Sequence, residues 1–258
     1  ELIKLELPLN MFIYGTYKYI LIISIAQEWL GFPVGSLLAV EIEDALKGDI
    51  VSNSIKMLFM PSETSFLRNV SIGSDQILVN VLDNIKGKII HFEKIGKTWF
   101  ESNIKGFDED MLSVAGSDNW SNRSFLESES FTQPTGLYFS ENSKEYKKIK
   151  SLPQKFDPTK YEVEQFFSES KDGTKIPYFQ ISRKDMIANS KNPTLLYGYG
   201  GFEISLTPSY LSAFTTKWID DGGVYVIANI RGGGEYGPKW HQSALKANRQ
   251  RAYDDFIS

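Results

Sequence analysis

The sequence contains no cysteine and only two histidines, His91 and His241, among its 258 residues. The absence of cysteine excludes disulfide bonds and thiolate metal sites, and it fits a protein of a reducing compartment. Because only two histidines are present, and they lie far apart in the chain, a histidine-rich metal site is excluded as well. We therefore expect no metal, no other cofactor and a cytoplasmic location.

Long apolar runs and a strong charge imbalance are also missing. The apolar segment 19–26 is far too short to span a bilayer. The formal net charge is -4 and no long basic run occurs, which argues against nucleic acid as the main partner. We expect no membrane segment and no signal peptide, because no basic stretch precedes a short apolar core and a cleavage site.

The two ends of the sequence lack the usual signals. Residue 1 is Glu, and residues 251–258 have the pattern of a helix with no glycine or asparagine after it. We therefore expect the sequence to be an interior piece of a longer chain.

Short strands separated by turns fill the first part of the sequence. The strands are apolar or alternating and are bounded by Gly, Asn, Asp, Ser or Pro. The clearest are residues 19–25, 36–42, 55–59, 76–82, 88–93, 111–115 and 136–140. Asp83-Asn84 and residues 86–88 have the composition of hairpin turns. A spacing of roughly ten residues between strands predicts a sandwich, a barrel or a propeller, and no internal repeat selects among them.

The character of the chain changes near residue 150. A lysine-rich stretch, 144–150, is followed by Pro153 and by residues 156–158, which we interpret as the passage into a second domain. The predicted domains are residues 1–155 and 156–258. In the second domain we expect a hairpin of 161–168 with 176–182, strands at 194–197 and 224–230, and helices at 211–220 and 238–258. Strands alternating with glycine loops and helices predict an α/β domain.

Two glycine-rich loops follow predicted strands of this second domain. The first, residues 197–202, reads Tyr-Gly-Tyr-Gly-Gly-Phe. It is either a tight turn whose aromatic rings fill the core, or a ligand-binding loop in which a tyrosine hydroxyl donates to a developing oxyanion.

The second loop has Gly232, Gly234 and Gly237 at the spacing of a dinucleotide-binding fingerprint. That motif needs an acidic residue about 20 positions later at the end of a strand, whereas Asp254 and Asp255 lie in a helical pattern. A nucleotide site is therefore only weakly indicated.

A serine nucleophile is not visible. None of the Gly-Ser pairs, at 35–36, 73–74 and 116–117, has the second glycine of a G-x-S-x-G elbow. His241 follows Trp240, a setting typical of packing or capping. A Ser-His-Asp triad therefore cannot be assembled from these residues.

The sequence resembles the prolyl oligopeptidase family of serine peptidases. The strongest similarity lies in residues 171–177, 195–202, 228–237 and 252–256, with the pair Trp240-His241, and weaker similarity extends over nearly the whole chain. The resemblance implies the C-terminal blades of a seven-bladed β-propeller in residues 1–155. It implies the N-terminal part of an α/β-hydrolase peptidase domain in 156–258, ending before the nucleophile.

The resemblance also implies functional roles. Tyr199 matches the family's oxyanion-hole tyrosine, and Phe202 matches an aromatic residue of the pocket for the substrate proline. Basic-specific relatives usually carry Gly-Ser-Tyr where this chain has Gly200, Gly201 and Phe202, so proline specificity is favoured. The parent enzyme is expected to be a monomer acting on short proline-containing peptides through an acyl-enzyme. Without the triad, the chain alone is expected to be inactive.

Two other readings remain. In the first, the chain is a non-catalytic propeller fragment that binds peptides or partners. In the second, it is a nucleotide-binding α/β protein that uses the second glycine loop.

Overall fold

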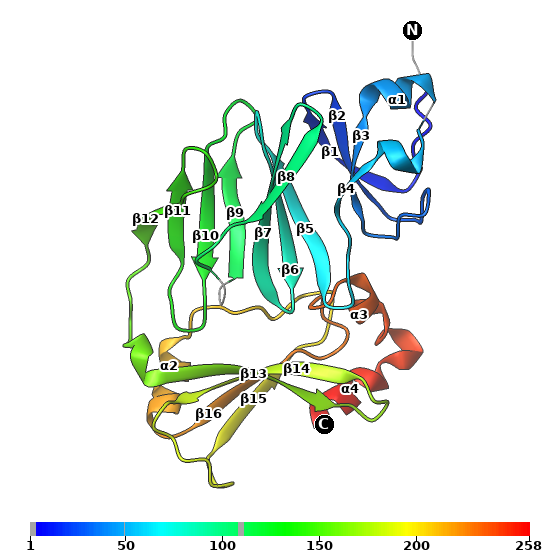
Figure 1. The fold of residues 1–258 in the computed structure, drawn as a ribbon. Coiled ribbons are helices and arrows are strands. Elements are labelled where there is room, and N and C mark those ends of the chain that lie inside the picture. Colours follow the sequence, from blue (N-terminus) through cyan, green and yellow to red (C-terminus); the bar gives the residue numbers. More distant parts are fainter. Residues whose placement is uncertain (1–3, 49, 108–110) are drawn as a thin grey trace.

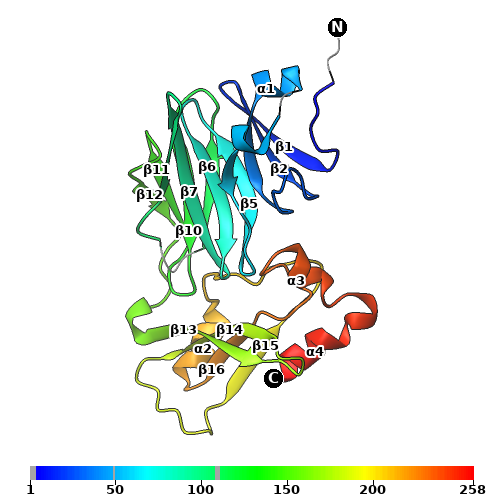
Figure 2. The same cartoon turned by 45° about the vertical axis from the view of Figure 1, so that its right-hand side comes forward.

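Four separate sheets make up the protein. The computed structural model describes residues 4–48, 50–107 and 111–258, and each of the four sheets in this part has four strands. Figure 1 shows three sheets fanned side by side in the upper half and the fourth sheet below them. The turned view in Figure 2 keeps this division into two halves.

The first three sheets are antiparallel meanders, in which strands adjacent in the chain are adjacent in the sheet. The first sheet comprises β1 (Met11–Tyr17), β2 (Ile20–Ile25), β3 (Leu37–Glu41) and β4 (Lys56–Phe59), with α1 (Ile42–Lys47) and η1 (Ser52–Ser54) before β4. The second comprises β5 (Ser65–Ile72), β6 (Ile77–Asp83), β7 (Lys86–Ile95) and β8 (Thr98–Asn103). The third comprises β9 (Met111–Ser117), β10 (Ser124–Glu129), β11 (Gly136–Ser140) and β12 (Lys147–Ser151). Four-stranded meanders are the units from which β-propellers are built.

All seven strands predicted in this half overlap observed strands, but β1, β5, β8, β10 and β12 were not predicted. β8 and β12 are outer strands with almost every residue outside the core, so they carry no alternation of apolar and polar residues. The lysine-rich stretch that we interpreted as part of the domain passage supplies most of β12. Lysines on an edge strand keep its free edge solvated.

One of the two predicted hairpin turns is wrong. Residues 86–88 lie inside β7, and the turn is made by Asn84 and Ile85, whose φ values are 49° and 71°. Two consecutive positive φ angles are typical of a type I′ turn.

Apolar and polar contacts hold neighbouring sheets together. The first and second sheets share a core that includes Ile22, Leu37, Ile77 and Phe92. Leu78 and Ile89 of the second sheet pack on Leu112 and Leu126 of the third.

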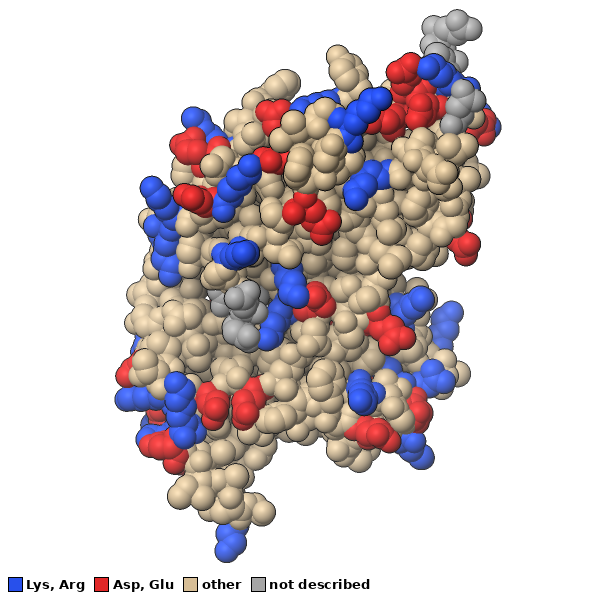
Figure 3. Space-filling view, in the orientation of Figure 1, with Lys and Arg blue, Asp and Glu red and all other residues tan. Residues whose placement is uncertain are grey.

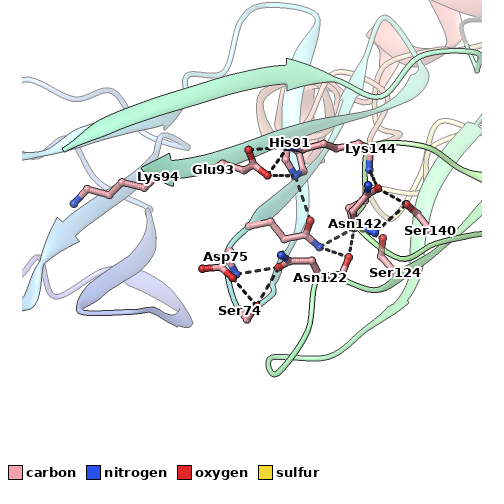
Figure 4. Close-up of polar contacts among 12 residues, drawn as sticks. Ser74, Asp75, His91, Glu93, Lys94, Asn122, Ser124, Ser140, Asn142 and Lys144 are labelled. Atoms are coloured by element: carbon pink, nitrogen blue, oxygen red, sulfur yellow. Dashed lines mark hydrogen bonds and ion pairs between the residues drawn. The ribbon is translucent and has the colours of Figure 1, made fainter. Parts of the chain in front are cut away.

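A buried polar cluster also joins the second sheet to the third. The Gln76 amide donates to Ser143 Oγ at 2.7 Å and to the Asn122 carbonyl at 3.1 Å. Its Oε1 lies 3.2 Å from His91 Nε2. Figure 4 shows His91, Glu93 and Lys144 around this cluster.

We expect His91 to make the stability of this inter-sheet contact depend on pH. Its side chain is only 3% exposed, and burial lowers the pKa of His91. Glu93 opposes this lowering and Lys144 reinforces it. The unfolded chain therefore binds the proton better than the folded chain does. The contribution of neutral His91 to the free energy of unfolding is complete above pH ~6.5 and is lost progressively as the pH falls below that value. Chemical denaturation from pH 5 to 8 should show this loss.

The matched variant is His91→Gln, whose amide nitrogen replaces Nε2 but does not titrate. Its stability should vary less between pH 5 and 7. An unchanged slope would assign the pH dependence to other groups.

The fourth sheet is of mixed direction and has the order β13-β14-β16-β15. β13 (Tyr161–Glu169), preceded by η2 (Pro158–Lys160), forms the predicted hairpin with β14 (Lys175–Arg183). β15 (Thr194–Gly198) runs parallel to β16 (Val224–Ala228), with α2 (Ala213–Asp220) between them in the chain. β16 is two residues shorter than predicted, so Asn229 and Ile230 belong to the loop that follows.

The single helix predicted over 238–258 is wrong. The chain forms α3 (Pro238–Gln242), η3 (Lys246–Asn248) and α4 (Gln250–Ile257). Lys246 has a φ of 51°, which no α-helix accommodates. The break lets Ala244 and Ala252 both enter the core formed with Ala228 and Ile230. Burial of both segments therefore prevails over helix propensity.

The turn between β6 and β7 connects the two halves of the molecule. Ile85 is fully buried in a cluster with Phe131, from the loop between β10 and β11, and with Tyr161 and Phe179 of the fourth sheet. Tyr236 OH donates to Asn84 Oδ1 at 3.0 Å. The turn thus rests against the loop after β16, where the second glycine motif lies.

The charged side chains of the face seen in Figure 3 are interspersed, with acidic and basic groups side by side. Within the described residues, no helix is both long and apolar enough to cross a membrane.

Candidate functional site

Two loops lie side by side at the carboxyl ends of the parallel strands β15 and β16. Gly198 is paired with Ala228 at the ends of these strands, so residues 199–206 and 229–237 leave the sheet at the same edge. In α/β sheets, ligands bind outside the carboxyl ends of the strands. This edge is therefore the candidate site.

Tyr199 and Phe202 both lie at the surface of the first loop. Tyr199 is 40% exposed and Phe202 is 84% exposed. Within the described residues, the Tyr199 hydroxyl has no hydrogen-bond partner. The interpretation of these rings as core-filling groups is therefore wrong, because both rings lie at the surface and not in the core.

The backbone of this loop is unusual at two consecutive positions. Phe202 and Glu203 have φ values of 53° and 57°. Such angles are uncommon outside glycine and persist only where surrounding contacts enforce them. Ile204 N donates to the Gly201 carbonyl at 3.0 Å, and Glu203 N donates to the Gly232 carbonyl at 3.3 Å. The turn is therefore held partly by the second loop.

The glycines of the second loop permit a close approach between the two loops. A Cβ at Gly232 would lie 2.3 Å from the Gly200 carbonyl oxygen, and one at Gly234 would lie 2.2 Å from that of Glu203. Both distances are too short for any side chain. The space that a dinucleotide phosphate would need beside these glycines is occupied by the first loop, so the fingerprint spacing reflects packing.

Arg231, at the start of the second loop, is held in a buried ionic network. Its Nε lies 2.9 Å from Asp255 Oδ2, and its Nη1 lies 2.7 Å from Asp172 Oδ2. Ser170 Oγ donates to Asp255 Oδ1 at 2.6 Å. The hydrogen bond and charge of Arg231 hold the pKa of the Asp172 carboxyl well below its usual range. Asp255, a candidate for the ribose-binding acid, instead anchors this loop to α4.

Glu235 anchors the far end of the first loop. It is fully buried, and its Oε1 accepts a hydrogen bond from Leu206 N at 2.9 Å. Asn229 Nδ2 donates to the Leu206 carbonyl at 2.8 Å. Burial raises the pKa of the Glu235 carboxyl. Both backbone groups of Leu206 are thus satisfied by the second loop.

Sequence reasoning missed these anchoring residues. A charged residue directly after the apolar run of β16 was the available signal for Arg231, but its partners are remote in the sequence. His241 caps backbone of the second loop, as its position beside Trp240 suggested, with Nδ1 2.6 Å from the Gly232 carbonyl oxygen. His91 lies in the other half of the molecule. The described residues hold no group of three His, Cys, Asp or Glu side chains suited to a metal ion.

Comparisons with known proteins identify the family to which this sequence is related. The profile of the prolyl oligopeptidase family matches residues 209–258. An uncharacterized peptidase of Sinorhizobium fredii is 36% identical over 98% of the chain, and the prolyl endopeptidase of Elizabethkingia miricola is 34% identical over 76%. The chain covers 36% and 28% of these proteins, so it spans about a third of their length.

A solved structure gives the same result for the fold. A post-proline cleaving enzyme from Rickettsia typhi matches 100% of the chain with a TM-score of 0.83 and 30% identity, and the match covers 38% of that enzyme. The first three sheets are accordingly propeller blades, and the fourth is the start of a hydrolase domain. The chain belongs to the prolyl oligopeptidase family of peptidases.

Proposed function

We propose that this chain is part of a serine-type oligopeptidase that hydrolyses short peptides after proline through an acyl-enzyme. The observation that carries the proposal is the half-exposed Tyr199, whose hydroxyl is unbonded at the carboxyl end of β15. A hydroxyl in this position is free to donate to an oxyanion as negative charge develops on a scissile carbonyl. Two relatives of known activity class, a prolyl endopeptidase and a post-proline cleaving enzyme, support the substrate class.

Each part of the chain has a role in this proposal. Tyr199 stabilises the tetrahedral intermediate, and the exposed ring of Phe202 lines the pocket for the substrate proline. The serine nucleophile, the histidine base and the acid that orients it lie outside these 258 residues. Residues 1–155 belong to the propeller that restricts access to short peptides, and residues 156–258 begin the peptidase domain.

Hydrolysis of a chromogenic Gly-Pro anilide tests this function. The product of the reading frame, taken through to its stop codon, should cleave after proline and should leave the corresponding Gly-Lys anilide nearly untouched. Residues 1–258 alone should give no turnover, because no serine elbow is present. Equal cleavage after lysine, no cleavage by the longer product, or turnover by residues 1–258 that scales with protein amount would each contradict the proposal.

A further inference from the structure

We infer that His241 is a positioning residue, which holds the turn at Phe202 and Glu203 and thereby aims the Tyr199 hydroxyl and the Phe202 ring. The inference rests on the proposed function, because it assigns His241 a role in the same site. It concerns a side chain of α3, which neither motif of the site includes.

The hydrogen bonds at His241 determine its tautomer. Nδ1 lies 2.6 Å from the Gly232 carbonyl oxygen and 3.1 Å from Glu203 N. Nδ1 cannot both accept from Glu203 N–H and donate to the Gly232 carbonyl. Because a carbonyl oxygen can only accept and its contact with Nδ1 is the shorter of the two, Nδ1 carries the proton and donates to Gly232. The Glu203 N–H then donates to the same carbonyl, at 3.3 Å. Gly232 O therefore receives two hydrogen bonds, one from the first loop and one from α3.

This shared carbonyl is one of the contacts that tie the strained turn to the rest of the domain. Phe202 and Glu203 hold positive φ angles, which relax unless other groups enforce them. Outside its own loop, Glu203 N–H donates to Gly232 O at 3.3 Å, and His241 Nδ1 lies 3.1 Å from the same nitrogen. By holding that oxygen in place, His241 fixes the position of Glu203 N and with it the backbone conformation of Phe202 and Glu203.

A second contact holds the other end of the same turn. The Arg249 guanidinium donates to the Gly200 carbonyl, and it lies over the Tyr253 ring at 5.2 Å. Arg249 follows η3, whereas His241 lies on α3. One segment of chain, from α3 to the start of α4, therefore contacts both sides of the Tyr199 loop.

Three substitutions in the active enzyme test the role of His241. The Asn amide nitrogen of His241→Asn can replace the Nδ1 donor, whereas the longer His241→Gln places its amide nearer the Nε2 position. His241→Ala and His241→Gln should lower kcat about tenfold to a hundredfold, the scale expected for a small misplacement of a catalytic group. His241→Asn should recover most of this loss. Lys239→Ala, on an exposed position of the same helix, is the matched control and should leave kcat unchanged.

A double variant tests whether His241 acts through Tyr199. If it does, adding His241→Ala to Tyr199→Phe should lower kcat little further, since the aimed hydroxyl is already absent, and any effect through the Phe202 ring should appear in KM. A loss that multiplies with that of Tyr199→Phe would overturn the inference. A His241→Asn variant as inactive as His241→Ala would overturn it too, because a donor at the Nδ1 position would then not restore the turn.

Amide hydrogen exchange separates this inference from the proposed function. In His241→Ala, residues 199–206 should exchange faster than in the unsubstituted protein, and in His241→Asn they should exchange at nearly the original rate. Melting temperatures identify any variant that is generally unfolded. If the unsubstituted enzyme shows no post-proline hydrolysis, the proposed function fails. If exchange over 199–206 is the same in all variants, His241 does not hold the turn, whatever the activity.

Discussion

Replacing Tyr199 with phenylalanine in the active enzyme is expected to lower kcat by about tenfold to a thousandfold, the range for loss of one oxyanion donor. The substitution removes only the hydroxyl, which makes no hydrogen bond within the described residues, so the fold loses nothing. The exposed ring still occupies its place beside Gly201. Because the lost bond strengthens in the transition state, the decrease should appear in kcat rather than in KM.

Tyr197→Phe provides the matched control. Tyr197 lies two residues earlier on β15 and is also partly exposed, so the same chemical change there should leave kcat unaltered. Steady-state kinetics and melting temperatures should be measured together for both variants. An unchanged kcat in Tyr199→Phe would remove this residue from the catalytic group and leave its loop as turn structure.

Replacing Arg231 with methionine is expected to destabilise the protein by about 3–5 kcal/mol, the cost typical of breaking a buried ion pair. The side chains of Arg231 and Asp255 are 5% and 0% exposed. Without the guanidinium, the Asp255 carboxylate stays buried and, among the residues that the structure describes, keeps only Ser170 Oγ and Arg231 N as donors. Chemical denaturation of the variant and the unsubstituted protein measures the difference in the free energy of unfolding.

Two further variants make this test specific. Arg251→Met removes a cation that lies 4.0 Å from Asp172, the second carboxylate bound by Arg231. Because the Arg251 side chain is 46% exposed, the loss of unfolding free energy should stay below about 1 kcal/mol. Combining Arg231→Met with Asp255→Leu should recover much of the stability, since no buried charge is then left unpaired. Equal costs for Arg231→Met and Arg251→Met would show that burial of the pair does not matter.

Local sequence signals predicted the elements that carry a turn motif or a regular apolar pattern. The hairpin of β13 and β14 has the turn motif Asp172-Gly173 between its strands, and β16 is a continuous apolar run. β8 and β12 were not predicted, because outer strands with exposed side chains carry no such pattern. The C-terminal helix was predicted as continuous because its composition favours a helix, and only its packing on the sheet explains the break near Lys246.

For the candidate site, too, the sequence predicted some features and only the structure revealed others. The sequence by itself determined the fold class, the two glycine loops and, through family resemblance, the expected roles of Tyr199 and Phe202. Only the tertiary structure decided that the second loop packs against the first, and that Arg231, His241 and Glu235 anchor the pair. Arg231 contacts Asp172 and Asp255, which are 59 and 24 residues away. Periodicity records which face of one element is buried, whereas contacts between distant segments arise only when the sheet places its strands side by side.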